Sequence, residues 1–444
     1  MSGFFGCVSR KDCVADVFYG TDYHSHLGTK RAGLAFYNGT EFNRSIHSLE
    51  SAYFRNKFEP ELDRFAGSNL GIGVISDMES QPITVTSHLG RFAVVVVGRL
   101  ANLDEIVDEF LKERKHFAEL SSSTVNPTEA VAMLINAGNT FKEGIENVYN
   151  KVKGSCSFLI LTETGIYAAR DKYGRTPIIL GKNEHGYVVA SETCAFDVLG
   201  AEYIRDVEPG EIVTLDHHGI RSQFYAEPQR HAMCAMEYVY FARPDSDIEG
   251  CNVHNYRKES GRILYKEAPA DADIVIGVPD SSLSAAQGYA EASGLPYEMG
   301  LIKSKYVGRT FILPTQSLRE KGVKMKLSPV KTIVKGKRVV LVDDSIVRGT
   351  TSLKIVKMLR EAGASEVHVR IASAPLKYTC YYGVDVHTPE ELISNSNSVE
   401  EVCRLIDADS LAFLSHKGML DAGHRDDLCL ACFNNEYPTD LYNE

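Results

Sequence analysis

Short apolar runs rich in β-branched residues, bounded by turn residues, dominate the pattern of the first half of this chain. Four such runs predict strands and one longer stretch predicts an amphipathic helix; the strands are at residues 91–97, 157–162, 186–190 and 212–215, and the helix is at 100–112. A Glu-Pro-Gly-Glu turn at residues 208–211 leads into the last strand. The first half, up to about residue 227, is therefore predicted to be rich in strands, with amphipathic helices between them.

The second half alternates between strand patterns and helix patterns. Strands are predicted at residues 272–278, 339–342 and 366–373, and helices at 283–293 and from Ser352 onward, where Ser352 is a suitable N-cap. Alternation of this kind indicates a parallel sheet with helices on both faces. Because ligands of such sheets bind at the carboxyl ends of the strands, we expect a site at the turns that follow these strands.

The turn after the strand at 339–342 concentrates polar chemistry. Two adjacent carboxylates, Asp343 and Asp344, end the strand, and an Arg, a Gly and three hydroxyl residues follow at 348–352. The open N–H groups of a helix start suit a phosphate, and Gly349 lets the backbone approach it. The carboxylates would repel that phosphate but suit ribose hydroxyls or Mg²⁺. A buried strand with an ordinary polar turn needs none of these residues, so the turn predicts a site for a sugar phosphate with a metal-bound pyrophosphate.

Composition and charge narrow the class of protein. The net charge of −11 argues against a general nucleic-acid binder, and no run of eighteen apolar residues predicts a membrane span. The first residues lack the basic start and long apolar region of a signal peptide. Ten cysteines in a chain with no export signal favour free thiols or metal ligands over a disulfide framework. These features predict a cytoplasmic globular protein of two to three domains.

The stretch at 339–352 resembles the phosphoribosyl-pyrophosphate (PRPP) loop of type I phosphoribosyltransferases. Residues 237–246, 306–311 and 322–326 are similar to segments of one family in particular, the glutamine phosphoribosylpyrophosphate amidotransferases. The resemblance covers nearly the whole chain and implies an α+β plus α/β architecture. Residues 1–227 would form a class II glutamine amidotransferase-like Ntn-hydrolase domain of four αββα layers, and residues 228–444 a type I phosphoribosyltransferase parallel-sheet domain with a C-terminal tail.

By that resemblance, the second half binds Mg·PRPP. Ser281, Asp343 and Asp344 would hold Mg²⁺, and the two acids would also hold the ribose. The other implied PRPP contacts are Ser345, Arg348, Gly349, Thr350, Thr351 and Ser352 near the 5′-phosphate, and Lys303, Lys305, Tyr306 and Arg309 on the pyrophosphate side. The basic segment 303–326 would ordinarily be a solvated charge run. It resembles the family's mobile loop, which would close over PRPP and exclude water.

The first half resembles the family in its scaffold motifs but not in its glutaminase residues. Segments 168–177, 190–195 and 208–211 match the scaffold. The family's catalytic positions differ at five places: Ser2 for the nucleophilic Cys, residues 26–29 for His-Arg-Gly-Gln, Ser76 for the Arg that grips the glutamine carboxylate, Val97 for the oxyanion Asn, and residues 126–129 for the amine-binding Ser-Asp-Ser-Glu. One missing oxyanion donor costs on the order of 10²–10³ in rate. Together these changes predict that glutamine hydrolysis is lost.

Two residues remain as candidate nucleophiles in the first half. Ser2 stands at the nucleophile position, and an N-terminal Ser is a nucleophile in some Ntn hydrolases, so this position alone leaves the question open. An engineered Ser2 is a further alternative, although the losses elsewhere favour natural change. Cys7 lies where the family's first strand enters the core, and a buried structural thiol is the better interpretation.

Cysteines form a second distinctive group in the latter half. Cys234, Cys380 and the pair Cys429 and Cys432 resemble the ligands of a structural [4Fe–4S] cluster that a subgroup of the family holds with four thiolates. The family's tail has a Cys three residues before the one that Cys429 matches, where this chain has Asp426. The fourth ligand is therefore Cys432 or Asp426, or the site is an empty remnant.

The resemblance implies a reaction of purine biosynthesis, in which ammonia attaches to C1 of PRPP and pyrophosphate leaves, giving 5-phosphoribosylamine. Free ammonia, or ammonia from a partner glutaminase, would replace glutamine. Purine nucleotides are expected as effectors, and a homo-oligomer as the assembly. The rival hypothesis is a non-catalytic regulator that senses PRPP and binds a partner, such as an active amidotransferase. The lid segment favours the enzyme, because a sensor needs less closure.

Overall fold

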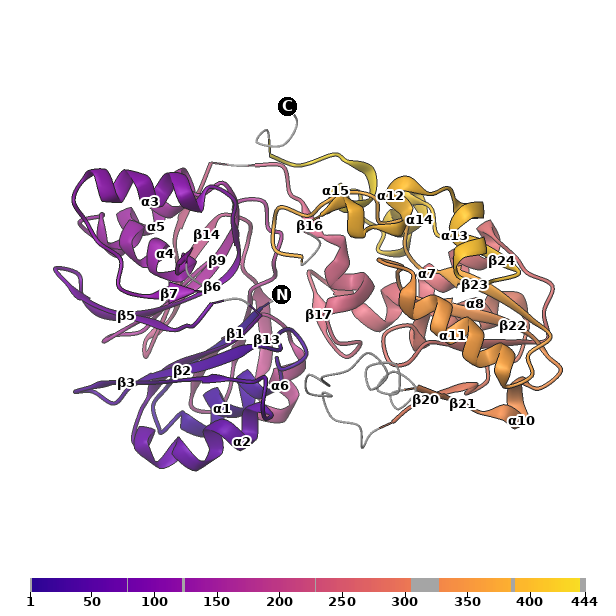
Figure 1. Cartoon of the computed structure of the whole chain (residues 1–444). Helices are drawn as coiled ribbons and strands as arrows, with labels where there is room; N and C mark the ends of the chain where they lie inside the picture. Colours follow the sequence, from indigo (N-terminus) through magenta and orange to yellow (C-terminus); the bar gives the residue numbers. More distant parts are fainter. Residues whose placement is uncertain are drawn as a thin grey trace.

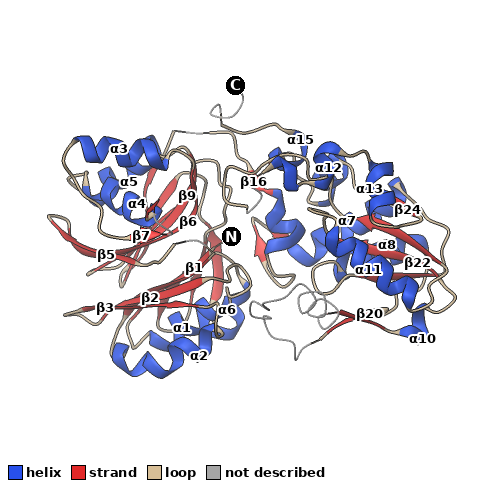
Figure 2. Ribbon diagram, in the orientation of Figure 1, coloured by secondary structure: helices blue, strands red, loops and turns tan. Residues whose placement is uncertain are grey.

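The computed structural model describes residues 2–77, 79–121, 124–227, 229–304, 327–384 and 388–439. The chain folds into two parts that lie side by side (Figure 1). The N-terminal part is built on two antiparallel sheets and the C-terminal part on a parallel sheet (Figure 2). Within the described ranges, no helix has the length and apolar character needed to cross a membrane.

Two sheets pack face to face in the N-terminal part. The first has the order β13 (Glu202–Asp206), β11 (Ile179–Lys182), β12 (Gly186–Ala190), β1 (Gly3–Ser9), β4 (Leu70–Ser76), β2 (Arg31–Tyr37) and β3 (Phe42–Ser48). The second has the order β15 (Gly219–Tyr225), β14 (Glu211–Asp216), β10 (Ile166–Ala169), β9 (Gly154–Thr162), β6 (Gly90–Leu100) and β5 (Ile83–Ser87). Phe4, Val74, Val95 and Leu159 are among the side chains that fill the space between the sheets.

Helices cover the outer face of each sheet. α1 (Val14–Asp22), α2 (Phe54–Phe58) and α6 (Cys194–Leu199) cover the first, and α3 (Leu103–Lys112), α4 (Pro127–Asn136) and α5 (Phe141–Lys151) cover the second (Figure 1). Along β1, Phe4 and Val8 pack between the sheets, whereas Phe5 and Cys7 pack under the helices. Both faces of such a strand are buried, which explains why its apolar run is continuous rather than alternating. The predicted four-layer αββα architecture is confirmed.

A parallel sheet forms the centre of the C-terminal part, in the order β19 (Ile274–Gly277), β22 (Arg338–Asp343), β23 (Glu366–Ile371) and β24 (Ser410–Phe413). Val275 and Val340 pack with α7 (Val253–Glu267) and α8 (Leu283–Ser293) on one face. Ile276 and Leu341 pack with α11 (Thr350–Glu361) and α13 (Val399–Leu405) on the other. The prediction of helices on both faces is therefore confirmed.

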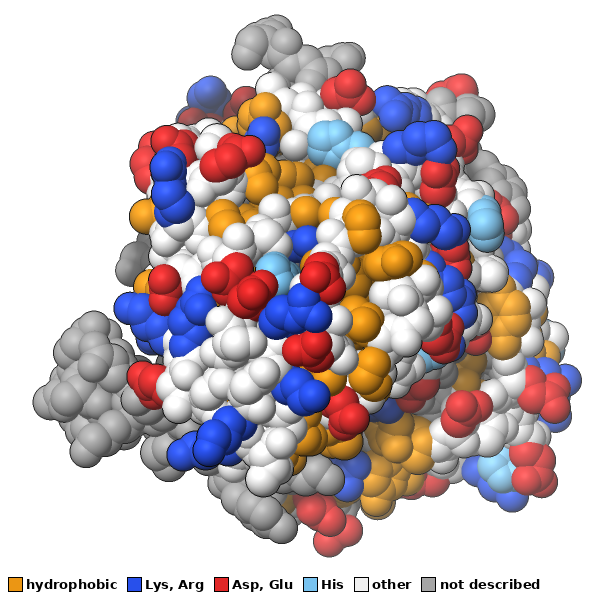
Figure 3. Space-filling view, turned by 90° about the vertical axis from the view of Figure 1, so that its right-hand side faces the viewer, with side chains coloured by type: hydrophobic (Ala, Val, Ile, Leu, Met, Phe, Trp, Pro, Cys, Tyr) orange, Lys and Arg blue, Asp and Glu red, His pale blue; other side chains and the backbone are white. Residues whose placement is uncertain are grey.

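Shorter elements complete the described chain. The short strands are β7 (Leu120–Ser121), β8 (Thr124–Val125), β16 (Met233–Cys234), β17 (Asp247–Ile248), β18 (Cys251–Asn252), β20 (Leu301–Lys303), β21 (Leu327–Pro329) and β25 (Leu428–Cys429). The short helical segments are η1 (Glu59–Phe65), η2 (Glu237–Phe241), α10 (Lys331–Val334), η3 (Pro389–Glu391), α12 (Ile393–Ser396), α14 (His416–Ala422) and α15 (Ala431–Asn434). On the face shown in Figure 3, the described acidic and basic side chains are interspersed.

Buried polar contacts join the two parts. Glu192 accepts hydrogen bonds from Arg243 N at 2.9 Å and Ser246 Oγ at 2.7 Å. Burial disfavours the charge of Glu192, but His26, with Nε2 at 2.6 Å from Oε1, acts together with His24 and the N–H of Arg243 to lower the pKa of Glu192 to about 2. Arg170, which is fully buried, pairs with Glu249 through Nη2 and Oε1 at 2.5 Å. These contacts hold the N-terminal scaffold against the start of the parallel-sheet part.

Candidate active site

The paired acids lie where two neighbouring parallel strands end. Asp343 is the last residue of β22, and Ser281 and Ser282 follow β19 beside it. Ser282 Oγ donates to Asp343 Oδ1 at 2.9 Å, and Ser281 Oγ donates to Asp344 Oδ2. Ser345 Oγ donates to Asp344 Oδ1 at 2.7 Å. The structure thus brings together the three residues that the sequence predicted as magnesium ligands, and adds Ser282.

Electrostatics at this point favour a bound cation. Burial, and then the charge of Asp344, raise the pKa of Asp343 to about 8. Burial also raises the pKa of Asp344, although hydrogen bonds from Ser281 and Ser345 oppose the shift. Two buried like charges side by side are costly, and a divalent cation between or beside them would relieve that cost. The donors are carboxylate and hydroxyl oxygens, which are the ligands that Mg²⁺ prefers.

The helix after the acids begins earlier than the sequence predicted. Gly349 is the N-cap of α11, with φ of +73°, and Ser352 lies in the first turn, so the predicted N-cap at Ser352 is wrong. Only glycine adopts this left-handed conformation cheaply, and a Cβ here would lie 2.5 Å from Ile393 Cδ1. The first intrahelical bond runs from Leu353 N to Gly349 O at 3.0 Å. The N–H groups of residues 350–352 therefore precede the helical ladder and are available to an anion.

Basic side chains stand around this turn. Lys303, at the end of β20, pairs with Asp280 through Nζ and Oδ2 at 2.5 Å. Arg348 pairs with Glu391 at 2.7 Å, and its side chain is 61% exposed. Thr350 and Thr351 are exposed, whereas Ser352 is buried. The predicted pyrophosphate contacts Lys305, Tyr306 and Arg309 lie outside the described residues.

Sequence reasoning missed Tyr240 at this site. Partial burial, followed by the charge of Asp344, raises the pKa of its phenol, and the charge of Lys303 opposes the shift. Tyr240 therefore lies close enough to Asp344 and to Lys303 for both charges to shift its pKa. Its place in the aromatic segment 238–241 indicates core packing, and only the fold shows that its side chain is 50% exposed.

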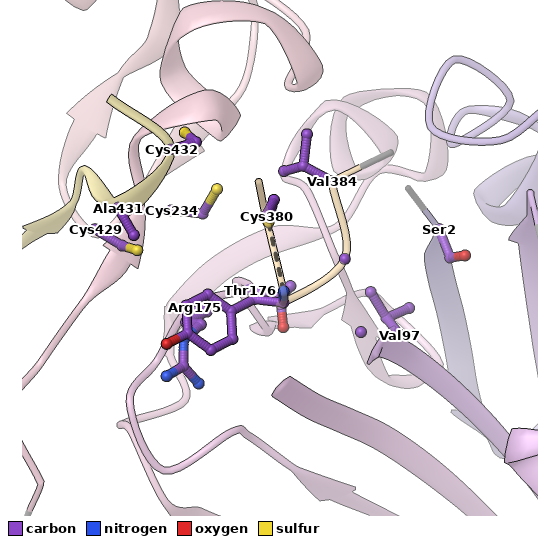
Figure 4. Close-up of a pocket in the computed structure, with 13 residues that line it drawn as sticks. Ser2, Val97, Arg175, Thr176, Cys234, Cys380, Val384, Cys429, Ala431 and Cys432 are labelled. Atoms are coloured by element: carbon purple, nitrogen blue, oxygen red, sulfur yellow. Dashed lines mark hydrogen bonds between the residues drawn. The ribbon is translucent and has the colours of Figure 1, made fainter. Parts of the chain in front are cut away.

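The positions that the resemblance assigns to glutamine hydrolysis also converge, but their side chains differ from those of the family's glutaminase. Ser2 stands just before β1, and its Oγ lies 3.4 Å from the Oγ of Ser76 at the end of β4. Val97 and Gly98 of β6 line the same cavity as Ser2 (Figure 4). Asn126 serves as the N-cap of α4 by accepting from Thr128 N at 2.9 Å. The place that would hold a carboxylate clamp and an oxyanion donor is thus occupied by a hydroxyl and an apolar side chain.

Two further buried polar side chains, Glu79 and Gln81, lie beside β6 and α4, and the sequence pattern did not reveal them. Gln81 binds the backbone of Val96 twice, at 3.0 Å through Nε2 and 2.7 Å through Oε1, and accepts from Thr128 Oγ1 at 3.3 Å. Glu79 is 5% exposed, and burial raises its pKa to about 7. Gln81 Nε2 donates to Glu79 Oε1 at 3.4 Å. Both residues belong to a short polar stretch that reads as a surface loop, so only packing shows that they are buried.

Cys7 is fully buried beneath the helices of the first sheet. A hydrogen bond with Cys13, together with burial, raises the pKa of the Cys7 thiol. A thiol in this environment is protonated and unreactive, in agreement with the interpretation of Cys7 as structural.

Four cysteines from distant segments line one cavity. Cys234 and Cys429 are register partners in the parallel pair β16 and β25. Cys432 O accepts from the N–H groups of residues 377 and 378 at 3.0 and 3.1 Å, which brings Cys380 to the same cavity. Figure 4 shows Cys234, Cys429 and Cys432 on one side, with Cys380 beside them and Ser2 across the cavity. All four thiols are unpaired by disulfides.

The alternative fourth ligand, Asp426, is exposed and does not line this cavity, whereas Cys432 is buried and does. Among the described residues, no three His, Cys, Asp or Glu side chains converge as ligands of one metal ion. A cubane cluster makes a different demand, because each of its four irons takes its own thiolate and the four sulfurs stand apart.

Comparison with known proteins agrees with this geometry. The family profile described as a glutamine amidotransferase domain matches residues 68–198, and that described as a phosphoribosyl transferase domain matches residues 257–381. The amidophosphoribosyltransferase of Bacillus subtilis (strain 168) is 45% identical over 460 residues, covering 100% of this chain and 95% of the relative. The amidophosphoribosyltransferase of Methanocaldococcus jannaschii is 39% identical over 469 residues, covering 99% of this chain and 98% of the relative.

Solved structures show the same likeness. The glutamine PRPP amidotransferase from B. subtilis complexed with ADP and GMP has a TM-score of 0.92 at 44% identity, covering 100% of this chain and 98% of that one. A structure described as the allosteric regulatory enzyme of purine biosynthesis gives the same TM-score and identity and covers 97% of that chain. With the paired acids, the helix mouth and both domain profiles in place along the full length, the chain belongs to the amidophosphoribosyltransferase family.

Proposed function

We propose that this chain transfers ammonia to C1 of PRPP, giving 5-phosphoribosylamine and pyrophosphate, and that it does not hydrolyse glutamine itself. Residues 228–444 would carry the transfer, and residues 1–227 would serve as a scaffold. The observation that supports the first half of the proposal most strongly is the convergence of Asp343, Asp344 and Ser281 beside the open start of α11.

Each group at this site has a role suited to its chemistry. The N–H groups of residues 350–352 would bind the 5′-phosphate, and Asp343 and Asp344 would hold the ribose hydroxyls and the metal. Bound Mg²⁺ would supply positive charge to the pyrophosphate. Lys303 would leave Asp280 and neutralise the departing group. Catalysis would then consist of positioning ammonia against C1 and stabilising the charge that develops on the leaving oxygen.

The filled glutaminase pocket supports the second half of the proposal. Ser76 offers a hydroxyl where a glutamine carboxylate would need a cation, and Val97 offers no donor to an oxyanion. Glu79 adds a buried carboxyl to the same region. A free glutamine would have to bring its own carboxylate into this environment without a positive partner, which is strongly unfavourable. Ammonia carries no such charge.

We further propose a [4Fe–4S] cluster in the cysteine cavity, with Cys234, Cys380, Cys429 and Cys432 as its ligands. The fit rests on four thiols that face one cavity, and iron would favour their thiolate forms. Burial raises the pKa of Cys429 to about 11. Iron would have to displace its proton, and the site would therefore load better at higher pH. Purine nucleotides are proposed effectors, since a B. subtilis relative was solved with ADP and GMP.

The test is pyrophosphate release from Mg·PRPP with ammonium or with glutamine as the nitrogen source. We expect turnover with ammonium and none above background with glutamine. Ser2→Ala should leave the ammonium rate unchanged, because Ser2 takes no part. Glutamine-dependent release equal to the ammonium rate would refute the loss of glutaminase. Tight PRPP binding without any turnover would instead favour the regulator.

A further inference from the structure

Arg175 is a buried cation whose hydrogen bonds are incomplete. Its side chain is 2% exposed and lines the cysteine cavity. Nη1 donates to Gly154 O at 2.8 Å and to Asp171 Oδ1 at 3.2 Å. Among the described residues, none accepts from Nε or Nη2, and both atoms are buried. Leaving two donors of a charged group unsatisfied is costly, so the pattern indicates an acceptor outside the described part of the chain.

The surroundings of Arg175 restrict where that acceptor can lie. The Cζ of the guanidinium lies 4.2 Å from the centroid of the Tyr173 ring and 3.8 Å from that of the Tyr382 ring. Rings this close occupy space over the guanidinium and leave its edge for hydrogen bonds, and Nη1 already uses part of that edge. Nε and Nη2 must therefore find their acceptor in the plane of the group.

The cysteines are immediate neighbours of this side chain. Arg175 O accepts from Cys234 N at 3.1 Å, so the two residues are joined through the backbone. The charge of Arg175 also lowers the pKa of Cys429, against a larger rise from burial. Figure 4 shows Arg175 below the four cysteines, among the residues that line the cavity. Arg175 thus lines the same cavity as the four thiols, beside the segment that carries Cys234.

We propose that Arg175 donates from Nε and Nη2 to sulfur atoms of the [4Fe–4S] cluster, beside Cys429. The inference rests on the proposed cluster. A positive donor stabilises the reduced cluster more than the oxidised one, because reduction adds negative charge. Arg175 therefore raises the reduction potential of the cluster and slows the loss of its iron, as partners of metal ligands generally do.

The experiment compares wild type with three variants, all purified without air. Arg175→Met removes charge and donors at similar length, and Arg175→Lys keeps the charge but loses the planar fork. Arg370→Lys is the matched control, because Arg370 is also buried but binds Ala268 O and Ser410 Oγ, away from the cavity. Iron and acid-labile sulfide per chain, the midpoint potential from a dye-mediated titration, and the rate of iron loss to a chelator are measured.

Arg175→Met should lower the ratio of reduced to oxidised cluster at a fixed potential at least tenfold, a fall of about 59 mV in midpoint for one electron. Iron loss should be roughly 10–100-fold faster. The midpoint potential and the rate of iron loss of Arg175→Lys should lie between those of wild type and those of Arg175→Met. Both quantities should be the same in Arg370→Lys as in wild type.

Two results would overturn the inference, and they are distinguishable. In the first, wild type contains four irons per chain while the Arg175 variants keep its midpoint potential and its resistance to the chelator. That result would show that the Arg175 donors bind only water, and the cluster proposal would stand. A wild type without iron and sulfide after anaerobic purification would remove the cluster and this inference together. If Arg175→Met does not fold, Arg175→Lys decides, with thermal unfolding of the iron-free proteins as the check on the scaffold.

Discussion

Replacing Asp343 with Asn should stabilise the ligand-free protein, and the gain should grow as the pH rises. Burial and the neighbouring Asp344 raise the pKa of Asp343 in the folded state to about 8, whereas an unfolded Asp has a pKa of about 3.9. Between these values the folded state binds more protons than the unfolded state. The stability of wild type is therefore highest below the unfolded pKa and is lost as the pH rises toward 8.

The size of the effect follows from the number of protons. A difference of one proton changes the free energy of unfolding by about 1.4 kcal/mol per pH unit. From pH 5 to pH 7 the advantage of Asp343→Asn should therefore grow by up to about 3 kcal/mol, or roughly 5–10 °C in melting temperature for a domain of this size. The amide keeps the local bonds, because its oxygen can still accept from Ser282 Oγ and Asp344 N.

The assay is thermal unfolding of both proteins at pH 5, 6, 7 and 8, with a chelator present and PRPP absent. Asp273→Asn serves as the control, because Arg338 lowers the pKa of Asp273 instead of raising it. The stability of this variant relative to wild type should therefore not increase as the pH rises. A difference between wild type and Asp343→Asn that stays constant across the range would refute the reasoning. The same variant should lose Mg·PRPP binding. The two adjacent carboxyl groups destabilise the empty site, and the same two groups would hold the ribose and the metal when the ligand is bound.

Two further outcomes follow from single positions. Gly349→Ala should weaken PRPP binding and should destabilise the protein by more than Gly336→Ala does. Both glycines have φ of +73°, and placing an alanine in this conformation costs about 1 kcal/mol at either position. Only at Gly349 would the added Cβ also clash with Ile393. Binding titrations and melting curves of the pair separate the clash from the backbone cost. Glu249→Gln should cost about 3–5 kcal/mol in urea unfolding at pH 7, because it leaves the buried Arg170 without its carboxylate. A hydrogen bond with His231 and the charges of Arg170 and Arg425 lower the pKa of Glu249 despite burial. The stabilisation by Glu249 is therefore present above the unfolded pKa near 4.3, and the difference in stability from the variant should close as the pH falls below about 4.

Local pattern was sufficient for the strands and helices that it predicted and for the polar turn that follows β22. The strand before Asp343, the helix after Ser282 and the alternation between them depend on apolar periodicity, which neighbouring residues encode. The N-cap prediction failed at Ser352, because the chain reverses three residues earlier at Gly349 in a left-handed conformation that spacing alone does not reveal. Element ends depend on such single dihedral angles, and tertiary contacts such as the one with Ile393 select them.

The sequence by itself determined what each half is built from and which chemistry the turn after β22 can offer. Tertiary structure alone decided which polar side chains are buried and which distant residues contact one another. It buried Glu79 and Gln81, joined Cys234 to Cys429 across a parallel strand pair, and left two buried donors of Arg175, which lines the cysteine cavity, without a described partner. The physical reason is that periodicity is a property of adjacent residues, whereas burial and unpaired donors arise only when distant segments pack together.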